Sequence, residues 1–165
     1  MKARSVCVAF VIAGGLTSLA SADGLKEQIV GTWLPVSQFV DQGGGKKLEP
    51  FGTTPKGMVM YDAGGRFVLV LHRADLPKFA SNNRLTGTAD ENKAVVQGSI
   101  AYFGRYTIDE AEGKINLDYD GSTYPNWDGD RQTRLISIAG DELKIVSPVS
   151  TVGGGVVHLV LRRAK

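Results

Sequence analysis

The segment "SIAYFGRYTIDEAEGKINLDYDGS", residues 99–122, contains two strand-like runs separated by the turn-forming residues "DEAEG" at 109–113. In the second run the apolar residues Ile115, Leu117 and Tyr119 alternate with polar residues. Successive side chains point to opposite faces of a strand, so this alternation predicts one apolar face and one polar face. A connection this short joins neighbouring strands antiparallel. The segment therefore predicts a β-hairpin with one buried face.

The rest of the chain repeats this signal. Runs rich in β-branched and aromatic residues cover 32–41, 57–62, 66–72, 131–139, 142–148 and 156–164. Short links such as "DAGG" at 62–65 and "AGD" at 139–141 favour antiparallel neighbours. With the first hairpin, these runs make eight candidate strands.

Eight antiparallel strands with few helical signals predict an all-β domain. Open sheet edges invite pairing with other chains, and closure into a barrel removes them. An eight-stranded barrel has an interior wide enough for packed side chains or one small ligand. We therefore expect a single antiparallel β-barrel of about eight strands.

Two short helical segments are expected beside the strands. Residues 25–30 can form an N-terminal helical turn with its apolar side chains close to one face. Further on, Thr88 is followed three residues later by Glu91, which is the capping-box pattern, and Gly98 supplies a stop. This pattern predicts one short helix near 88–98.

The first residues have the pattern of a secretory signal peptide. Lys2 and Arg4 precede an apolar run, and the small residues Ala20-Ser21-Ala22 follow it. We expect residues 1–22 to be cleaved on export, leaving one domain at 23–165 in the periplasm or outside the cell. No later segment reaches the roughly 20 apolar residues of a membrane span.

Charge and cysteine content narrow the function classes. The net charge of +2 comes from Lys2 and Arg4, so residues 23–165 carry no net charge and give no reason to expect a nucleic-acid partner. The one cysteine, Cys7, lies in the leader. The exported domain would therefore have no disulfide, no thiol nucleophile and no thiolate ligand.

Two ends of the chain resemble lipocalins and their relatives. The segment "IVGTWLPVSQ" places Gly31 two residues before Trp33, and the last strand carries "LVLRRAK". In such proteins this tryptophan closes the barrel floor and a basic residue of the last strand packs across it. The resemblance implies that Gly31, Trp33 and either Arg162 or Arg163 close the barrel.

Longer stretches resemble the bacterial lipocalin-like domain family over nearly the whole exported chain. They are "EPFGTTPKGMVMYDAGGRFVLVL", "LPKFASNNRLTGTADENKAVVQGSIAYFGRYTIDEAEGKI" and "DGSTYPNWDGDRQTR". The family has no agreed reaction, so the resemblance implies a small-ligand barrel. Many relatives have histidine near positions 117 and 118, where this chain has Leu117 and Asp118. A function that needs those histidines is in doubt here.

The residues with metal-binding or catalytic potential do not form a recognisable site. Asn126, Asp128 and Asp130 alternate like the start of a calcium loop, but the glycine and the final glutamate of that motif are missing. The only histidines, His72 and His158, have no cluster of ligands near them in sequence. We expect no metal and no cofactor.

The loop 121–134, the strands at 99–109 and 114–122, and the end of the strand at 66–72 supply the candidate ligand-binding residues. Pockets for small molecules are mostly apolar or aromatic with a few fixed polar groups. The aromatic residues of these segments, with an arginine, a histidine and an asparagine among them, fit that description. Tyr102 and Tyr106 would face one side of their strand and Arg105 the other, unless a bulge at Gly104 changes the direction. The predicted ligand-binding set is His72, Tyr102, Arg105, Tyr106, Tyr119, Tyr124, Asn126 and Trp127.

These observations predict an exported lipocalin-like protein that binds a small apolar or aromatic ligand inside the barrel. Arg105 or His72 would meet a polar or acidic group of that ligand. The first alternative is an enzyme on the same barrel, an isomerase, cyclase or hydrolase of hydrophobic molecules, with His72 or Tyr102 as acid or base. The second alternative is an interaction or inhibitor protein that acts through its outer surface. The binding function is the expectation we favour over catalysis.

Overall fold

The computed structural model describes residues 24–165. The proposed signal peptide and Cys7 lie outside these residues. The described chain contains nine strands, and all paired strands are antiparallel. They are β1 (Gly31–Asp41), β2 (Lys47–Leu48), β3 (Lys56–Tyr61), β4 (Arg66–His72), β5 (Ser99–Asp109), β6 (Lys114–Ser122), β7 (Arg131–Ala139), β8 (Glu142–Ser147) and β9 (Val156–Arg163).

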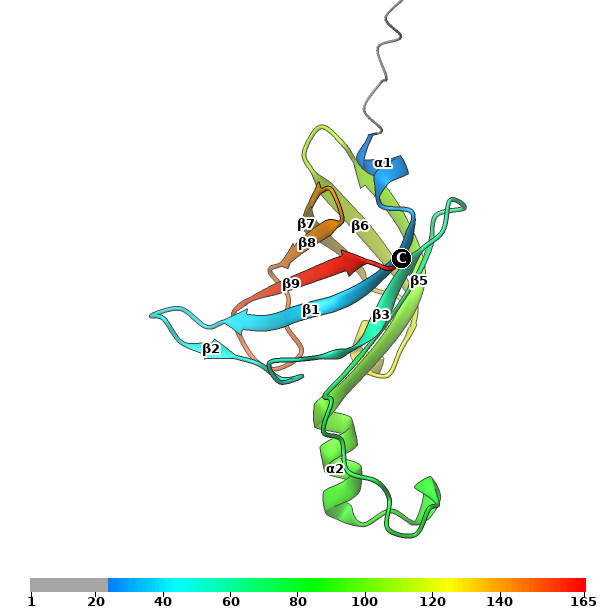
Figure 1. Cartoon of the computed structure of the whole chain (residues 1–165), viewed down its shortest axis with the longest axis vertical. Coiled ribbons are helices and arrows are strands. Elements are labelled where there is room, and N and C mark those ends of the chain that lie inside the picture. Colours follow the sequence, from blue (N-terminus) through cyan, green and yellow to red (C-terminus); the bar gives the residue numbers. More distant parts are fainter. Residues whose placement is uncertain (1–23) are drawn as a thin grey trace, which may run out of the picture.

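Eight of these strands close into a barrel (Figure 1). The order is β1-β3-β4-β5-β6-β7-β8-β9, and β9 pairs back onto β1 from Trp33↔Arg163 to Asp41↔Val156. The two-residue β2 only extends the far end of β1. The all-β barrel fold predicted from the sequence is confirmed, together with its eight strands.

Four short helical segments accompany the barrel. They are α1 (Leu25–Gln28), η1 (Arg84–Thr86), α2 (Ala89–Gly98) and η2 (Pro125–Trp127). The predicted capping box is present in α2: the Thr88 hydroxyl accepts from the Glu91 amide at 3.2 Å, and Glu91 Oε2 accepts from the Thr88 amide at 2.8 Å. Figure 1 shows α2 projecting away from the barrel. Within residues 24–165, none of the helices has the length and apolar character needed to cross a membrane.

One end of the barrel is closed by Trp33, which is fully buried. Its indole nitrogen donates to the Ile29 carbonyl at 2.8 Å. The Arg163 guanidinium lies 4.2 Å from the centroid of the indole ring and donates to the Val30 carbonyl at 3.0 Å and to the Gln28 carbonyl.

Of the two candidates, Arg162 and Arg163, the basic residue of this closure is Arg163. Leu159 and Leu161 point into the barrel, and Arg163 continues their alternation. Arg162 falls on the outer face, where it is exposed and pairs in register with Leu34 and Glu142.

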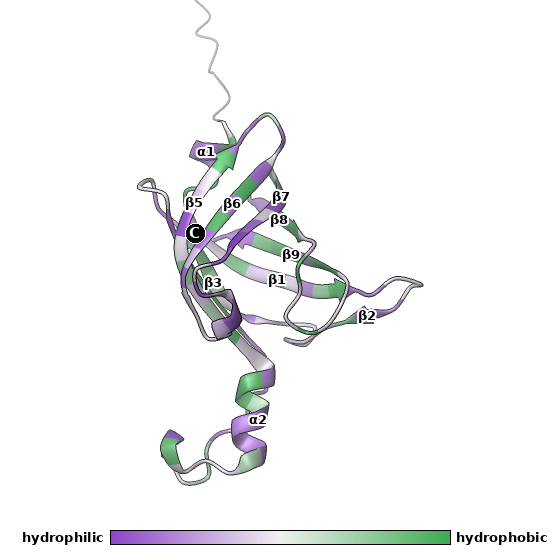
Figure 2. Cartoon of the chain, turned by 180° about the vertical axis from the view of Figure 1, so that it is seen from behind, coloured by the Kyte–Doolittle hydropathy of each residue, from purple (hydrophilic) through white to green (hydrophobic). Residues whose placement is uncertain are grey.

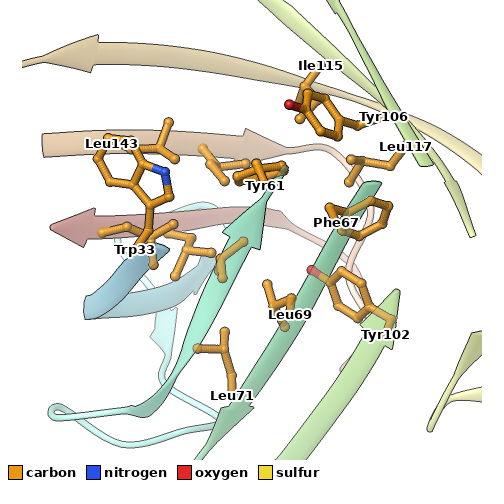
Figure 3. Close-up of a cluster of buried hydrophobic side chains, with 14 of the residues drawn as sticks. Trp33, Tyr61, Phe67, Leu69, Leu71, Tyr102, Tyr106, Ile115, Leu117 and Leu143 are labelled. Carbon is orange, nitrogen blue, oxygen red and sulfur yellow. The ribbon is translucent and has the colours of Figure 1, made fainter. Parts of the chain in front are cut away.

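Aromatic and branched aliphatic side chains fill the barrel interior. Figure 3 shows residues from neighbouring strands converging there, among them Tyr61, Phe67 and Tyr102. Figure 2 shows hydrophobic residues concentrated in the barrel strands, whereas α2 also carries strongly hydrophilic residues. The interior is thus built largely by inward residues of the predicted strands.

The register of β5 against β6 shifts at Gly104. Phe103 pairs with Gly121 and Gly104 with Tyr119, so the extra residue of the bulge, Asp120, lies on β6. The sequence suggested a bulge in β5 itself, but β5 keeps its alternation through this point. A Cβ at Gly104 would lie 1.9 Å from the backbone oxygen of Asp118, so only glycine allows this approach. The bulge leaves Tyr102 and Tyr119 both facing the interior.

Candidate functional site

A pocket opens at the end of the barrel opposite Trp33. The hollow measures about 520 Å³ with its open mouth, and its enclosed volume is about 50 Å³. Strand residues such as Gln38, Tyr102 and Arg134 line its inner part, and the β8–β9 loop and Phe51 line its mouth. The enclosed space holds only a few water molecules, so a larger occupant requires side chains at the mouth to move outward.

Strand β7 brings a buried arginine into this pocket. Its residues alternate between exposed and buried positions, and Gln132, Arg134 and Ile136 face inward. Arg134 is only 6% exposed. Its Nη1 donates to the Tyr102 hydroxyl at 2.9 Å, and its Nη2 donates to the Tyr119 hydroxyl at 2.6 Å and to Gln132 Oε1 at 3.2 Å. The Tyr119 hydroxyl in turn donates to Gln132 Oε1 at 3.0 Å.

This arginine has no carboxylate partner among the described residues, whose ion pairs all join other side chains. Removing an ion from water costs several kcal/mol even after the protein relaxes, and an opposite charge normally offsets that cost. Here only neutral oxygens of tyrosine and glutamine face the guanidinium. The cluster therefore places an uncompensated positive charge inside the barrel.

Two buried polar atoms of this pocket lack a hydrogen-bond partner. Among the described side chains, Arg134 Nε and Gln38 Oε1 are the buried nitrogen and oxygen atoms without one, and both residues line the pocket. Buried polar groups are almost always paired, and an unpaired one typically costs about 1–3 kcal/mol. The pocket thus presents one free donor and one free acceptor.

Three aromatic rings surround the guanidinium. Tyr102 and Tyr119 stand nearly perpendicular with their centroids 5.2 Å apart, and Trp127 lies 5.5 Å from Tyr102 and 5.3 Å from Tyr119. The Arg134 guanidinium carbon lies 5.5 Å from the Tyr102 centroid and 5.8 Å from that of Trp127. These rings can contact the faces and edges of another aromatic molecule.

Burial favours the neutral form of two tyrosines in the barrel interior. Burial raises the pKa of Tyr119, and the Arg134 guanidinium offsets only part of that rise. Burial also raises the pKa of Tyr61 deeper in the barrel. For Arg134, burial works against the charged form, yet the phenol oxygens of Tyr102 and Tyr119 beside it keep its pKa above the usual value. At neutral pH the cluster is a cation among uncharged groups.

The structure brings four of the sequence-predicted ligand residues together around this pocket. Tyr102 and Trp127 line it directly, and Tyr119 joins it through Arg134. Tyr124 packs edge-on against Trp127 with centroids 5.8 Å apart. The segment 121–134 thus inserts Trp127 into the pocket end of the barrel through the short helix η2.

The other four predicted ligand residues lie elsewhere. Tyr106 is buried, but its hydroxyl donates to the Asp62 carbonyl at 2.7 Å, away from the pocket lining. Arg105 and Asn126 are exposed. His72 takes the outward position after Leu71 in β4, and its Nδ1 lies 2.7 Å from the Arg73 carbonyl oxygen. Arg134 is therefore the charged side chain that lines this pocket, and neither His72 nor Arg105 reaches it.

Sequence reasoning missed Arg134, Gln132 and Gln38. The available signal was the alternation in "RQTRLISIA", which places 132 and 134 on the same face as Ile136. In β1, Gln38 shares its inward direction with Val40.

Comparisons with known proteins agree with this architecture. A family model described as a lipocalin-like domain matches residues 30–157. The chain is 32% identical over 89 residues to the 4'-hydroxy-3'-methoxypropiophenone carrier protein of Aspergillus oryzae, which covers 49% of this chain and 80% of that protein.

Two solved structures are similar at low sequence identity. A lipocalin-like protein from Bacteroides uniformis has 13% identity and a TM-score of 0.44, with 82% of this chain and 98% of that chain covered. An uncharacterized protein from Bacteroides eggerthii has 12% identity and a TM-score of 0.42, with 82% and 99% covered.

Proposed function

The chain belongs to the lipocalin-like domain family, and on that premise we propose that it carries a small aromatic molecule in the pocket around Arg134. The observation that carries the proposal is the pair of buried atoms without partners, Arg134 Nε and Gln38 Oε1, in one pocket. A ligand with an acceptor at one end and a donor at the other would satisfy both.

The carrier relative gives an example of this chemistry. The compound in its name has a ketone oxygen, which accepts hydrogen bonds, and a phenolic hydroxyl on the opposite side of the ring, which donates one. In our proposal the acceptor oxygen meets Arg134 and the donor meets Gln38. The ring lies against Tyr102 and Trp127, which supply the aromatic contacts.

The small enclosed volume sets a limit on the ligand. The cavity measures about 50 Å³, and the hollow of about 520 Å³ includes space open to solvent, so even a single substituted ring fits only if the mouth opens. The β8–β9 loop, with Val149 and Val152 on the lining, is the part of the mouth that must yield. It contains Gly153, Gly154 and Gly155, and glycine adopts a wide range of backbone conformations.

We also propose that carriage takes place after export. The pattern of residues 1–22 supports removal of a signal peptide, which would place the protein in the periplasm or outside the cell. Mass measurement of the protein purified from its own host tests this, since cleavage after Ala22 predicts a chain beginning at Asp23.

The binding experiment uses 4'-hydroxy-3'-methoxypropiophenone as the probe, with isothermal titration calorimetry for affinity and NMR of the released compound for its integrity. We expect saturable binding and release of the compound unchanged. Arg134→Gln and Gln38→Leu should each weaken binding at least tenfold, because each leaves one end of the ligand without its partner. Arg105→Gln, on the exposed face of β5, is the matched control and should bind as the unmodified chain does.

Three results would speak against the proposal. Absence of saturable binding, or equal affinity in the Arg134 and Arg105 variants, would reject the pocket as the binding site. Consumption of the compound during incubation would replace the carrier with an enzyme on the same barrel, and Tyr102, as the predicted acid or base that lines the pocket, would be the first residue to substitute.

A further inference from the structure

The positive charge of Arg134 inside the barrel restricts the chemical class of the ligand more than the shape of the pocket does. Among the described residues, the buried polar and charged side chains are Gln38, Gln132, Arg134 and Ser147, so Arg134 is the one buried side chain with a charge. Its hydrogen-bond partners are two phenols and an amide, none of which is negatively charged at neutral pH. The interior therefore carries one net positive charge.

Neutral partners orient this guanidinium without neutralising it. Nη1 and Nη2 donate to the phenol and amide oxygens, but the buried Nε–H has no partner among the described residues. A water molecule at Nε would add no opposite charge. A negatively charged group beside Nε would accept its N–H and also neutralise the guanidinium.

The Tyr102 hydroxyl is a second donor of the pocket lining. It accepts from Arg134 Nη1, so its oxygen is engaged, but its own hydrogen has no acceptor among the described residues. Tyr102 and Arg134 both line the pocket. The lining therefore holds a neutral donor and a charged donor, and a charged donor binds a carboxylate more strongly than a neutral acceptor.

Resting on the proposed function, we infer that the physiological ligand is an aromatic carboxylate bound as its anion, with its carboxylate on Arg134. The ring occupies the space beside Trp127 and Tyr102. A hydroxyl on the far side of the ring donates to Gln38 Oε1. Such a molecule neutralises the buried charge and pairs both free atoms of the pocket.

The test compares ligands that share a ring and differ in one group. The probes are 4-hydroxy-3-methoxybenzoate, its methyl ester, and the methyl ketone 4'-hydroxy-3'-methoxyacetophenone, titrated into the full domain at pH 7. We expect the carboxylate to bind at least tenfold more tightly than either neutral probe. The advantage should disappear as the pH falls and the carboxyl group of the probe becomes protonated, whereas binding of the ketone should not follow the same curve.

The matched variants are Arg134→Met, which keeps the length of the side chain without its charge, and Arg105→Met on the outer face. Arg134→Met should remove the preference for the carboxylate, and Arg105→Met should retain it. Arg134→Met removes an uncompensated buried charge but also leaves the Tyr102 hydroxyl without its donor, so thermal unfolding first confirms that each variant is folded.

The outcomes separate this inference from the proposed function. If the ketone and ester bind as tightly as the carboxylate, the inference fails while carriage of an aromatic molecule stands. If no aromatic probe binds, the proposed function fails first. If Arg134→Met does not fold, the comparison of the three probes on the unmodified chain still decides the question, and a carboxylate preference retained in a folded Arg134→Met would overturn the role of this residue.

Discussion

The closure of the barrel by Arg163 makes a quantitative prediction about stability. Arg163→Ala removes a guanidinium that lies 4.2 Å from the Trp33 ring centroid and donates to two carbonyl oxygens just before β1, those of Val30 and Gln28. These contacts join the last strand to the segment that precedes the first. Their loss should loosen the seam where β9 pairs with β1.

The magnitude follows from the contacts. A cation over an aromatic ring contributes about 0.5–2 kcal/mol, and a hydrogen bond to a charged group contributes about 1.5–3 kcal/mol. Because Arg163 is only partly buried, each contribution falls toward the lower end of its range. We therefore expect Arg163→Ala to lower the free energy of unfolding by about 2–4 kcal/mol.

Urea denaturation followed by far-ultraviolet circular dichroism measures this loss. The control is Arg162→Ala, an exposed position on the same strand, which should change the free energy of unfolding by less than about 0.5 kcal/mol. Equal losses in the two variants, or a loss below about 0.5 kcal/mol in Arg163→Ala, would refute the assignment of Arg163 as the closing residue.

Three further predictions concern the bulge, the buried tyrosines and α2. Gly104→Ala should lower the free energy of unfolding by about 2–3 kcal/mol, because the new Cβ would lie 1.9 Å from a carbonyl oxygen of β6. Urea denaturation measures the loss. The control is Gly154→Ala, where a Cβ would have no atom within 4 Å. Burial raises the pKa of Tyr61 and Tyr119 in the folded chain, so the folded state holds their protons longer than the unfolded state and stability should fall as the pH rises above about 10. Unfolding midpoints against pH check the sign, and a midpoint that rises there would contradict it. Thr88→Ala should speed amide hydrogen exchange in α2, because it removes about 1 kcal/mol of capping stabilisation. The thermal unfolding midpoint of the whole domain should stay unchanged, because α2 projects from the barrel. A large fall in that midpoint would show that α2 supports the barrel.

Much of the fold was accessible from the sequence because its signals are local. The hairpin at 99–122 shows its alternation and its turn within one short window, and the Thr88 capping box requires only four residues. The glycine inside the 99–109 strand pattern indicated where the register shifts, although the extra residue is Asp120 on β6. Each of these features depends on neighbouring residues in the chain.

The site was harder to predict from the sequence, because β7 buries a charged residue and exposes its apolar neighbour. In β7 the apolar Leu135 is 51% exposed, while its charged neighbour Arg134 is 6% exposed. A charged residue with an apolar neighbour is normally assigned to the outer face. Such conflicts between local preference and the observed structure are expected where function takes precedence over stability.

The choice between Arg162 and Arg163 was left open for a simpler reason. The resemblance supplied a basic residue on the last strand without its register. The alternation of Leu159 and Leu161 supplies that register, because it assigns 163 to the interior and 162 to the outside. For His72, the same rule applied to Phe67, Leu69 and Leu71 gives the outward direction that the structure shows.

The two tryptophans of the chain occupy opposite ends of one barrel. Trp33 is fully enclosed under Arg163, and Trp127 lines the mouth of the pocket. The fluorescence of Trp33 should therefore report on folding of the closed end of the barrel, and that of Trp127 on ligand in the pocket. Replacing either indole by phenylalanine would leave a single-emitter protein, in which folding and loading can be watched separately without any attached dye.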